Sequence, residues 1–310
     1  MNIVLVAEES AGIQALRLVT GRGHHVSRVL TSAPEGARGS TVAGVADQLG
    51  IEVLPARLVT KPALAEQMKI DGVDLLLNIH SLYVAHPDVI AAPTIGSFNL
   101  HPGPLPEYAG LNVPSWAIYH GQRRHGVTLH WMAAKVDAGH IAFADSFEIE
   151  PRDTGLTLTA KCVRRGLPLV DALLDLASTD PAGIPAIRQD LSLRRYFGRR
   201  VPHGGWVPWQ LRARQVVDFV RACDYSPWAS PWGEPRARAG SVEFTVRGAG
   251  LTGQPAPEPP GTVDGAASGC VLVAAADEWV LVERVQIEGR RVPPEEVLAP
   301  GERLEITDIE

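Results

Sequence analysis

Asn99 and His101 stand two residues apart in the stretch Phe-Asn-Leu-His-Pro-Gly-Pro-Leu-Pro-Glu-Tyr-Ala-Gly, which spans residues 98–110. On an extended strand, both side chains point to the same face. An Asn amide can donate a hydrogen bond to an oxyanion, and a His can exchange protons with an attacking or leaving nitrogen. A carboxylate from Asp137, in the turn Asp-Ala-Gly, would fix the tautomer of the imidazole and raise its pKa. Together, these three residues fit acyl transfer to an amine.

The spacing of these residues also fits a plainer interpretation. An Asn-x-His at the end of a strand can be a capped turn, and Asp-x-Gly is common in ordinary turns. Metal-binding signatures such as HxH and HExxH are absent here, so we predict no metal. Four histidines keep zinc open as a minor alternative: His101, His120, His125 and His130. The residues alone therefore leave open whether the chain is an enzyme.

Short apolar strands alternate with helices through the first part of the chain. This alternation predicts an α/β, Rossmann-like domain with a mostly parallel sheet. Residues 7–12, after the first strand, lack the pattern GxGxxG, so a nicotinamide dinucleotide site is rejected. Ligands of such sheets gather at the carboxyl ends of the strands, where Asn99, His101 and the pair His80-Ser81 are expected. The predicted strands are 2–7, 25–31, 51–54, 73–79, 126–132 and 141–149, and the predicted helices are 11–20, 41–49, 62–69, 114–120 and 154–177.

The second part of the chain has β character. Pro168 predicts a kink or break in the helix at 154–177, and the irregular, basic stretch that follows at 180–201 indicates an interdomain connection. Beyond it, turns separate one predicted helix and several short strands, which indicates a small barrel or sandwich: 215–223, 242–247, 270–274 and 279–287. We therefore predict two domains, a catalytic domain with its linker at 1–200 and a C-terminal β domain at 201–310.

Charge and cysteine usage restrict the partners and the compartment. The chain has 310 residues and a formal net charge of −6, and residues 201–310 hold ten Arg, no Lys and sixteen acidic residues. Because nucleic-acid affinity depends on neutralising phosphates, this acidic domain disfavours a nucleic-acid partner. The three cysteines lie far apart without a CxxC motif, which predicts a reducing, cytoplasmic location. No apolar run reaches the roughly 18 residues of a membrane span, so no membrane partner is predicted.

The stretch around Asn99 resembles the signature of the formyltransferases that use 10-formyltetrahydrofolate. That signature runs Asn-x-His-(Pro or Gly)-Ser-Leu-Leu-Pro, a Gly-containing loop, Trp-Ala-Ile, Gly-Val-Thr and Asp-x-Gly. The resemblance implies a Rossmann-like formyltransferase domain and a C-terminal β-barrel similar to an OB fold. The matching residues follow one another in the same order: Asn99-Leu100-His101-Pro102-Gly103-Pro104-Leu105-Pro106, Gly110, Trp116-Ala117-Ile118, Gly126-Val127-Thr128 and Asp137-Ala138-Gly139.

The resemblance also implies a role for each motif residue. His101 matches the general acid and base, Asn99 the stabiliser of the oxyanion, and Asp137 the carboxylate that raises the pKa of His101. The formyl donor would be 10-formyltetrahydrofolate. The family's folate contacts, largely to backbone groups, fall on Tyr83, Val84, Ala85, Leu111, Ala133, Ala134, Lys135, Val136 and Asp137.

The stretch 105–112 is similar to formylation enzymes of specialised metabolism, that is, of natural product biosynthesis. The predicted acceptor is a primary amine or hydroxylamine of a small metabolite: an amino sugar, an amino acid or a carrier-bound aminoacyl group. Methionyl-tRNA formyltransferase is an alternative that Glu107 and the acidic C-terminal domain disfavour. Formyltetrahydrofolate hydrolase is another alternative, and a non-enzymatic folate-binding module is the least favoured. The oligomeric state stays open, with a homodimer among the options.

Overall fold

The structure is a computed structural model, and it describes residues 1–32, 40–267 and 269–306. The chain divides into two compact units. The first unit consists of Met1–Gly110, His125–Phe147 and Ala160–Tyr196, and the second of Leu111–Arg124, Glu148–Thr159 and Phe197–Glu310. Because two segments before residue 160 belong to the second unit, the chain passes between the units more than once. The predicted domain boundary at residue 200 remains a prediction.

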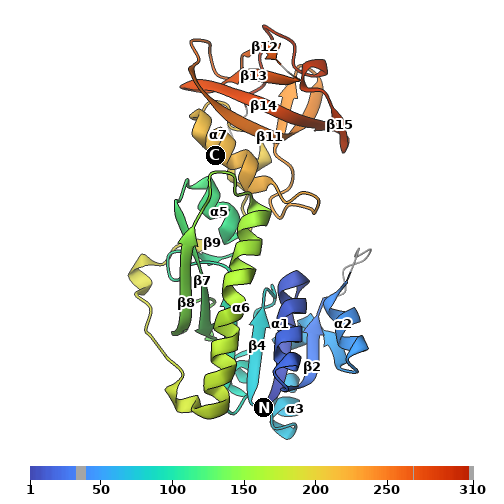
Figure 1. The fold of residues 1–310 in the computed structure, drawn as a ribbon, viewed down its shortest axis with the longest axis vertical. Coiled ribbons are helices and arrows are strands. Elements are labelled where there is room, and N and C mark those ends of the chain that lie inside the picture. Colours follow the sequence, from blue (N-terminus) through green and yellow to red (C-terminus); the bar gives the residue numbers. More distant parts are fainter. Residues whose placement is uncertain (33–39, 268, 307–310) are drawn as a thin grey trace. The chain divides into compact units, whose positions relative to one another are not determined.

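A seven-stranded sheet, counted within the described residues, forms the centre of the first unit (Figure 1). Its strand order is β3-β2-β1-β4-β5-β7-β8, and the first five of these pair in parallel whereas β7 is antiparallel to β5. The predicted α/β, mostly parallel sheet is therefore confirmed. The strands are β1 (Asn2–Ala7), β2 (His25–Thr31), β3 (Glu52–Pro55), β4 (Leu75–Ile79), β5 (Gly96–His101), β7 (Arg124–Trp131) and β8 (Ile141–Glu148).

Helices cover both faces of this sheet. Strand β1 shows why this is needed, because its side chains are apolar on both faces and must be buried on both. Ile3 and Leu5 face one buried cluster, and Val4 and Val6 face the other. The first cluster includes residues of α1 (Glu9–Gly21), α2 (Val42–Gln48) and α6 (Gly155–Thr179). The second includes residues of η1 (Ala56–Thr60), α3 (Pro62–Ile70) and α4 (Pro87–Ala91).

Helix α6 runs unbroken from Gly155 to Thr179 with Pro168 inside it, so the predicted break is wrong, whereas the alternative of a kink stays a prediction. Proline removes one intrahelical hydrogen bond, but the apolar residues that α6 buries on both sides of it hold the helix against the sheet. Its acidic residues Asp171 and Asp175 also form ion pairs with Arg22, next to α1. Packing therefore overrides the local signal of the proline.

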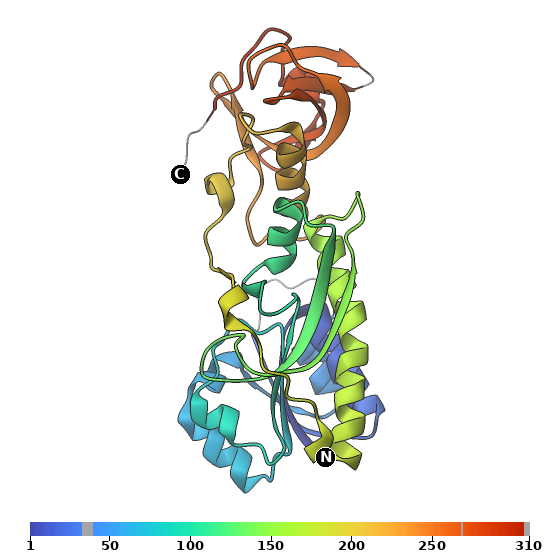
Figure 2. The ribbon, with the colours of Figure 1, turned by 90° about the vertical axis from the view of Figure 1, so that its left-hand side faces the viewer.

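The second unit holds an antiparallel half-barrel (Figure 2). This sheet has the order β10-β11-β14-β13-β12, with β15 paired to β14. The predicted small β domain is confirmed at this level, and the finer likeness to an OB fold stays a prediction. The elements are β10 (Arg236–Ala239), β11 (Val242–Pro255), β12 (Val263–Ala267), β13 (Cys270–Ala274), β14 (Glu278–Ile287), β15 (Arg290–Val292), α5 (Val113–Tyr119) and α7 (Ala213–Cys223).

Several short elements link these larger ones, and the sequence analysis did not anticipate them. They are β6 (Ala109–Gly110), β9 (Tyr196–Phe197), η2 (Pro181–Gly183), η3 (Leu191–Leu193), η4 (Pro202–Gly205) and η5 (Pro294–Glu296). Within the described residues, none of the helices is both long and apolar enough to cross a membrane.

Candidate active site

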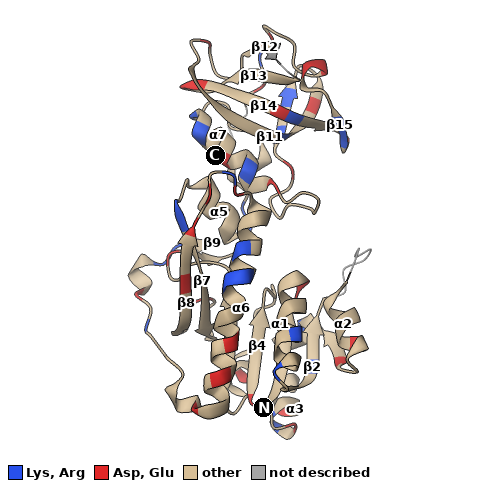
Figure 3. Ribbon diagram, viewed as in Figure 1, with Lys and Arg blue, Asp and Glu red and all other residues tan. Residues whose placement is uncertain are grey.

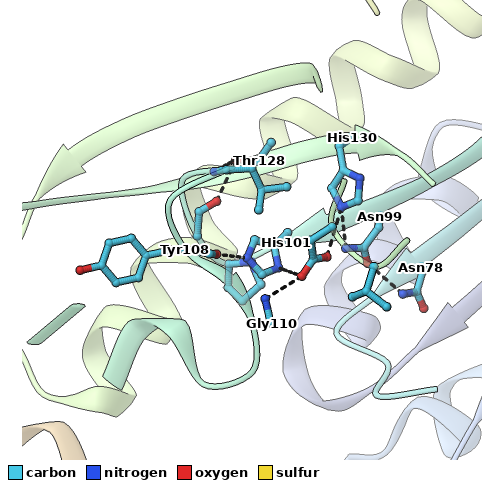
Figure 4. A network of polar contacts seen from close by, with 12 residues as sticks. Asn78, Asn99, His101, Tyr108, Gly110, Thr128 and His130 are labelled. Carbon is cyan, nitrogen blue, oxygen red and sulfur yellow. Dashed lines mark hydrogen bonds and ion pairs between the residues drawn. The ribbon is translucent and has the colours of Figure 1, made fainter. Parts of the chain in front are cut away.

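Strand β5 places Asn99 and His101 near its carboxyl end, as the sequence predicts, and its neighbours fix the amide of Asn99 (Figure 4). Asn78 on β4 lies opposite Asn99 in the parallel register, and its Nδ2 donates to Asn99 Oδ1 at 2.8 Å. On the other side, β7 places His130 Nε2 3.0 Å from Asn99 Nδ2. Strand pairing therefore gathers three polar side chains from three strands on one face of the sheet.

The direction of these hydrogen bonds follows from the Trp131 carbonyl, which can only accept. It lies 2.8 Å from His130 Nδ1, so that nitrogen donates. His130 Nε2 lies 3.0 Å from the Asn99 amide nitrogen and 3.5 Å from Asp137 Oδ1. In the neutral ring Nε2 accepts from the amide, and in the protonated ring it donates to the carboxylate. The oxygen of Asn99 is already bonded to Asn78. Among the described residues, the second amide hydrogen of Asn99 has no acceptor, which leaves it available to a developing oxyanion.

The imidazole of His101 is oriented by a second carbonyl. Its Nε2 lies 2.6 Å from the oxygen of Tyr108, so Nε2 carries a proton and donates it to that bond. Its Nδ1 lies 3.7 Å from Asp137 Oδ2. The nitrogen that can accept a proton is therefore the one beside the carboxylate, which would stabilise the resulting imidazolium.

Burial and charge set the protonation of this pair. The side chain of His101 is only 4 % exposed, and burial lowers its pKa by more than Asp137 and the Tyr108 carbonyl raise it. Burial by itself raises the pKa of Asp137, but His101, His130 and the Gly110 N–H together hold it well below its usual range. Asp137 raises the pKa of His101, as predicted, but desolvation is larger, so the pKa of His101 lies below its ordinary value. The resting site pairs a neutral imidazole with an ionised carboxylate.

The Asp-x-Gly turn holds the carboxylate through backbone geometry. Asp137 has φ +54°, in the left-handed region, and its Oδ2 accepts from the Gly110 N–H at 2.8 Å. Gly110 itself has φ +99°, which favours glycine. A Cβ on Gly139 would lie 1.8 Å from the Trp131 carbonyl oxygen, so this position has no room for a side chain. The Asp137 carboxylate depends on both glycines for its place.

The segment that the sequence analysis interpreted as a connection also braces this turn. Gln189, 7 % exposed, donates through Nε2 to the carbonyls of Asp137 at 3.1 Å and Gly139 at 2.6 Å. Arg194 Nη2 donates to the Val136 carbonyl at 3.0 Å. A lone Gln in an irregular stretch carries no sequence signal, so these contacts were not foreseen.

The proline-rich turn after β5 is held by side chains of β7. Thr128 Oγ1 donates to the Gly103 carbonyl at 2.8 Å and accepts from the Leu105 N–H at 3.2 Å. His125 Nε2 donates to the Pro102 carbonyl at 2.8 Å. Burial lowers the pKa of His125 to about 4, so this ring is neutral at pH 7. The Gly-Val-Thr motif thus has a structural reason, since its Thr shapes the turn beside His101.

The predicted folate-contacting residues fall into three groups. Tyr83 and Val84 are 40 % and 59 % exposed just after β4, whereas Ala85 is buried in the apolar core and offers only backbone groups. Leu111 belongs to the second compact unit. The remaining residues precede or include the Asp137 carboxylate, and all but the last two are exposed: Ala133, Ala134, Lys135, Val136 and Asp137. Their roles stay predictions.

Asn78 and His130 contribute to the site in ways that were not predicted. His130 was named only as one of several histidines, and Asn78 was not singled out. Each lies opposite Asn99 in the strand register, which becomes visible only when β4, β5 and β7 are aligned. Among the described residues, there is no group of three or more His, Cys, Asp or Glu side chains arranged to hold a metal ion.

Comparisons with known proteins agree with this architecture. Residues 2–167 match the family model "Formyl transferase", and residues 201–301 match "Formyl transferase, C-terminal domain". An N-formyltransferase from Helicobacter canadensis, in complex with folinic acid and dTDP-3-aminofucose, superimposes with a TM-score of 0.70 at 14% identity. That match covers 91% of this chain and 98% of the other.

Two further structures have the same fold. WlaRD, a sugar 3N-formyl transferase in the presence of dTDP and 5-N-formyl-THF, has a TM-score of 0.71 and 14% identity, over 94% of this chain and 98% of that one. HypX from Aquifex aeolicus, in complex with tetrahydrofolic acid, has a TM-score of 0.64 and 18% identity, over 96% of this chain and 46% of that one. At these identities, the likeness shows the fold. The family match, which spans more than half of the chain, confirms the predicted enzyme class: this chain belongs to the formyl transferase family.

Proposed function

We propose that this protein is an N-formyltransferase that moves a formyl group from 10-formyltetrahydrofolate to a primary amine or hydroxylamine of a small metabolite. The observation that carries the proposal is the set of groups at the end of β5. An amide hydrogen of Asn99, a neutral nitrogen of His101 and the ionised carboxylate of Asp137 lie side by side. Acyl transfer to nitrogen needs these three groups.

Each residue has one task in this scheme. The folate donor, when bound, supplies the formyl group. Asn99 donates its spare amide hydrogen to the formyl oxygen as negative charge develops there. His101 Nδ1 takes the proton from the attacking amine and passes it to the leaving nitrogen, while Asp137 stabilises the transient imidazolium. One C–N bond forms, one breaks, and the proton moves from the acceptor nitrogen to the donor nitrogen.

The exposed apolar side chains that follow β4 fit a flat donor ring. Leu82, Tyr83 and Val84 are consecutive and exposed, which is uncommon for apolar residues unless a ligand or partner covers them. The complexes of the H. canadensis enzyme and WlaRD with formylated folates support the choice of donor.

A structural relative and the charge of the C-terminal part of the chain support the choice of acceptor. The H. canadensis relative is complexed with an amino sugar joined to dTDP, which supports an amino sugar as the first acceptor to test. The half-barrel carries both signs of charge (Figure 3), and residues 201–310 are acidic in sum. This balance again disfavours transfer RNA as the acceptor.

A transfer assay tests the proposal. The protein is incubated with 10-formyltetrahydrofolate alone and with dTDP-3-aminofucose, free amino acids or hydroxylamine, and both tetrahydrofolate release and the formylated amine are measured. We expect tetrahydrofolate release that depends on an amine and matches the formylated product mole for mole. Release without any amine would favour the hydrolase instead. No release with any acceptor would overturn the proposal.

A further inference from the structure

His80 lies at the candidate active site and has no role in the scheme above. It directly follows β4 and has φ +60°, in the left-handed region that favours glycine. A side chain other than glycine in this conformation is strained and persists only where the surrounding structure imposes it. Such residues are concentrated at functional sites, which draws attention to the contacts that this imidazole can make.

The strand register places His80 near His101. Asn78 pairs with Asn99 and Ile79 with Leu100, so the residue that follows β4 comes next to the level of His101, at the carboxyl end of β5. The two imidazoles interact electrostatically, and burial together with His101 lowers the pKa of His80 to about 4. The side chain is partly exposed, and no hydrogen bond or ion pair of its ring is found within the described part of the chain. A neutral imidazole thus stands at the site with its hydrogen-bonding capacity unused.

An attacking amine requires hydrogen-bond acceptors, and the imidazole of His80 can be one of them. A neutral primary amine has one lone pair, which attacks the formyl carbon, and two hydrogens, which need acceptors once water is excluded. His101 Nδ1 can accept one of them. Asn99 is the weaker candidate for the other, because its oxygen already accepts from Asn78 and its free group is a donor. Within the described part of the chain, His80 offers a further neutral acceptor at this end of the sheet.

We propose that His80 binds the acceptor by accepting a hydrogen bond from the second N–H of the amine, which aims the nitrogen lone pair at the formyl carbon. This inference rests on the proposed N-formyltransferase function. It makes His80 a specificity-determining residue that favours primary over secondary amines. A secondary amine has a single hydrogen, which goes to His101, and leaves His80 without a partner.

A glycine substitution tests this role without adding strain. His80→Gly removes the imidazole at a position where glycine adopts the backbone angle freely. Glu288→Gly is the matched control, because Glu288 also has a positive φ, +48°, but lies in the turn between β14 and β15 of the second unit. Both variants relieve the same kind of strain, so both should fold at least as stably as the wild type.

The experiment measures kcat and KM for 10-formyltetrahydrofolate, for dTDP-3-aminofucose and for its N-methyl analogue. We expect His80→Gly to lower kcat/KM for the primary amine roughly tenfold, the effect of one lost hydrogen bond, with an unchanged donor KM. Activity on the N-methyl analogue should change little, and imidazole added to the buffer should restore part of the loss. Glu288→Gly should match the wild type throughout.

The outcomes separate the two claims. Wild-type kcat/KM for the primary amine in His80→Gly would overturn the role of His80 and leave the proposed function intact. An equal loss for both amines without rescue by imidazole would also overturn it, because a merely structural defect behaves in that way. A wild-type protein that transfers no formyl group to any amine would overturn the proposed function, and the role of His80 with it.

Discussion

Two clusters of side chains, one in each compact unit, are held together by different interactions: hydrogen bonds in the first unit and aromatic packing in the second. The site cluster at the end of β5 is joined by directional hydrogen bonds of 2.6–3.0 Å. The aromatic cluster of the second unit is joined by ring contacts with centroids 4.9–6.3 Å apart, and its members include Trp116, Tyr119, Phe197, Phe219 and Trp232. The first fixes which atom donates and which accepts, whereas the second fills volume. Substitutions should therefore affect activity in the first cluster and stability in the second.

The largest effect is expected where a reacting group is removed. Asn99→Ala or His101→Ala should each lower kcat/KM by about 10²–10⁴, because each removes a group that acts in the transition state. The temperature of unfolding should change little by comparison. Steady-state kinetics and thermal unfolding of the same samples check this, and near-wild-type transfer by both variants would contradict the assignment.

The pH profile sharpens the role of the carboxylate. Asp137→Asn keeps the shape of the side chain but removes the charge beside His101 Nδ1. Since Asp137 raises the pKa of His101, its loss should lower that pKa further and displace the acid limb of the rate profile toward lower pH, with a reduced maximum. An unchanged profile of kcat/KM against pH would show that the two groups are not coupled.

A methyl group added to Gly139, in the Asp137 turn, should disrupt the site by displacing the backbone that positions the carboxylate. Gly139→Ala places a Cβ where the Trp131 carbonyl stands, so the turn must move and carry the carboxylate away from His101. We expect a loss of activity of about 10² with some loss of stability. Gly198→Ala is the matched control, because nothing lies within 4 Å of its added Cβ. Equal activity of the two variants would contradict this account.

The aromatic cluster should show the reverse pattern. Trp232 is buried and packs edge-on against Trp116 and Tyr119. Trp232→Ala should lower the free energy of unfolding by about 3–5 kcal/mol, as for other buried aromatic residues, while kcat/KM per folded molecule stays near the wild-type value. Urea unfolding and kinetics measure both quantities. A selective loss of activity without destabilisation would show that this cluster belongs to the site.

The smallest effect concerns stability in acid. His125 has a folded pKa of about 4 against an ordinary value of 6.5, so between these values the unfolded chain binds a proton that the folded chain does not. Its contribution is therefore complete above pH 6.5 and is lost as the pH falls toward 4. His125→Gln should reduce the slope of unfolding free energy against pH by about 1.4 kcal/mol per pH unit at most. An identical slope in urea unfolding between pH 7 and pH 4.5 would argue against the buried neutral ring.

The sequence by itself determined the α/β class of the first part and the β character of the second, and it singled out the three motif residues Asn99, His101 and Asp137. Hydrophobic periodicity and turn residues are local, so they are readable without the fold. The Pro168 signal was also local, and its prediction of a break failed because packing against the sheet outweighed one lost hydrogen bond.

Only the tertiary structure decided what the motif residues can do. The pairing of β4, β5 and β7 brings Asn78 and His130 to Asn99 and fixes its free hydrogen, although 21 and 31 residues separate them along the chain. Burial then lowers the pKa of His101, although Asp137 raises it, and so keeps the imidazole neutral. Spacing shows that an amide and an imidazole share a strand face, whereas donor direction, tautomer and desolvation depend on atoms that distant parts of the chain supply.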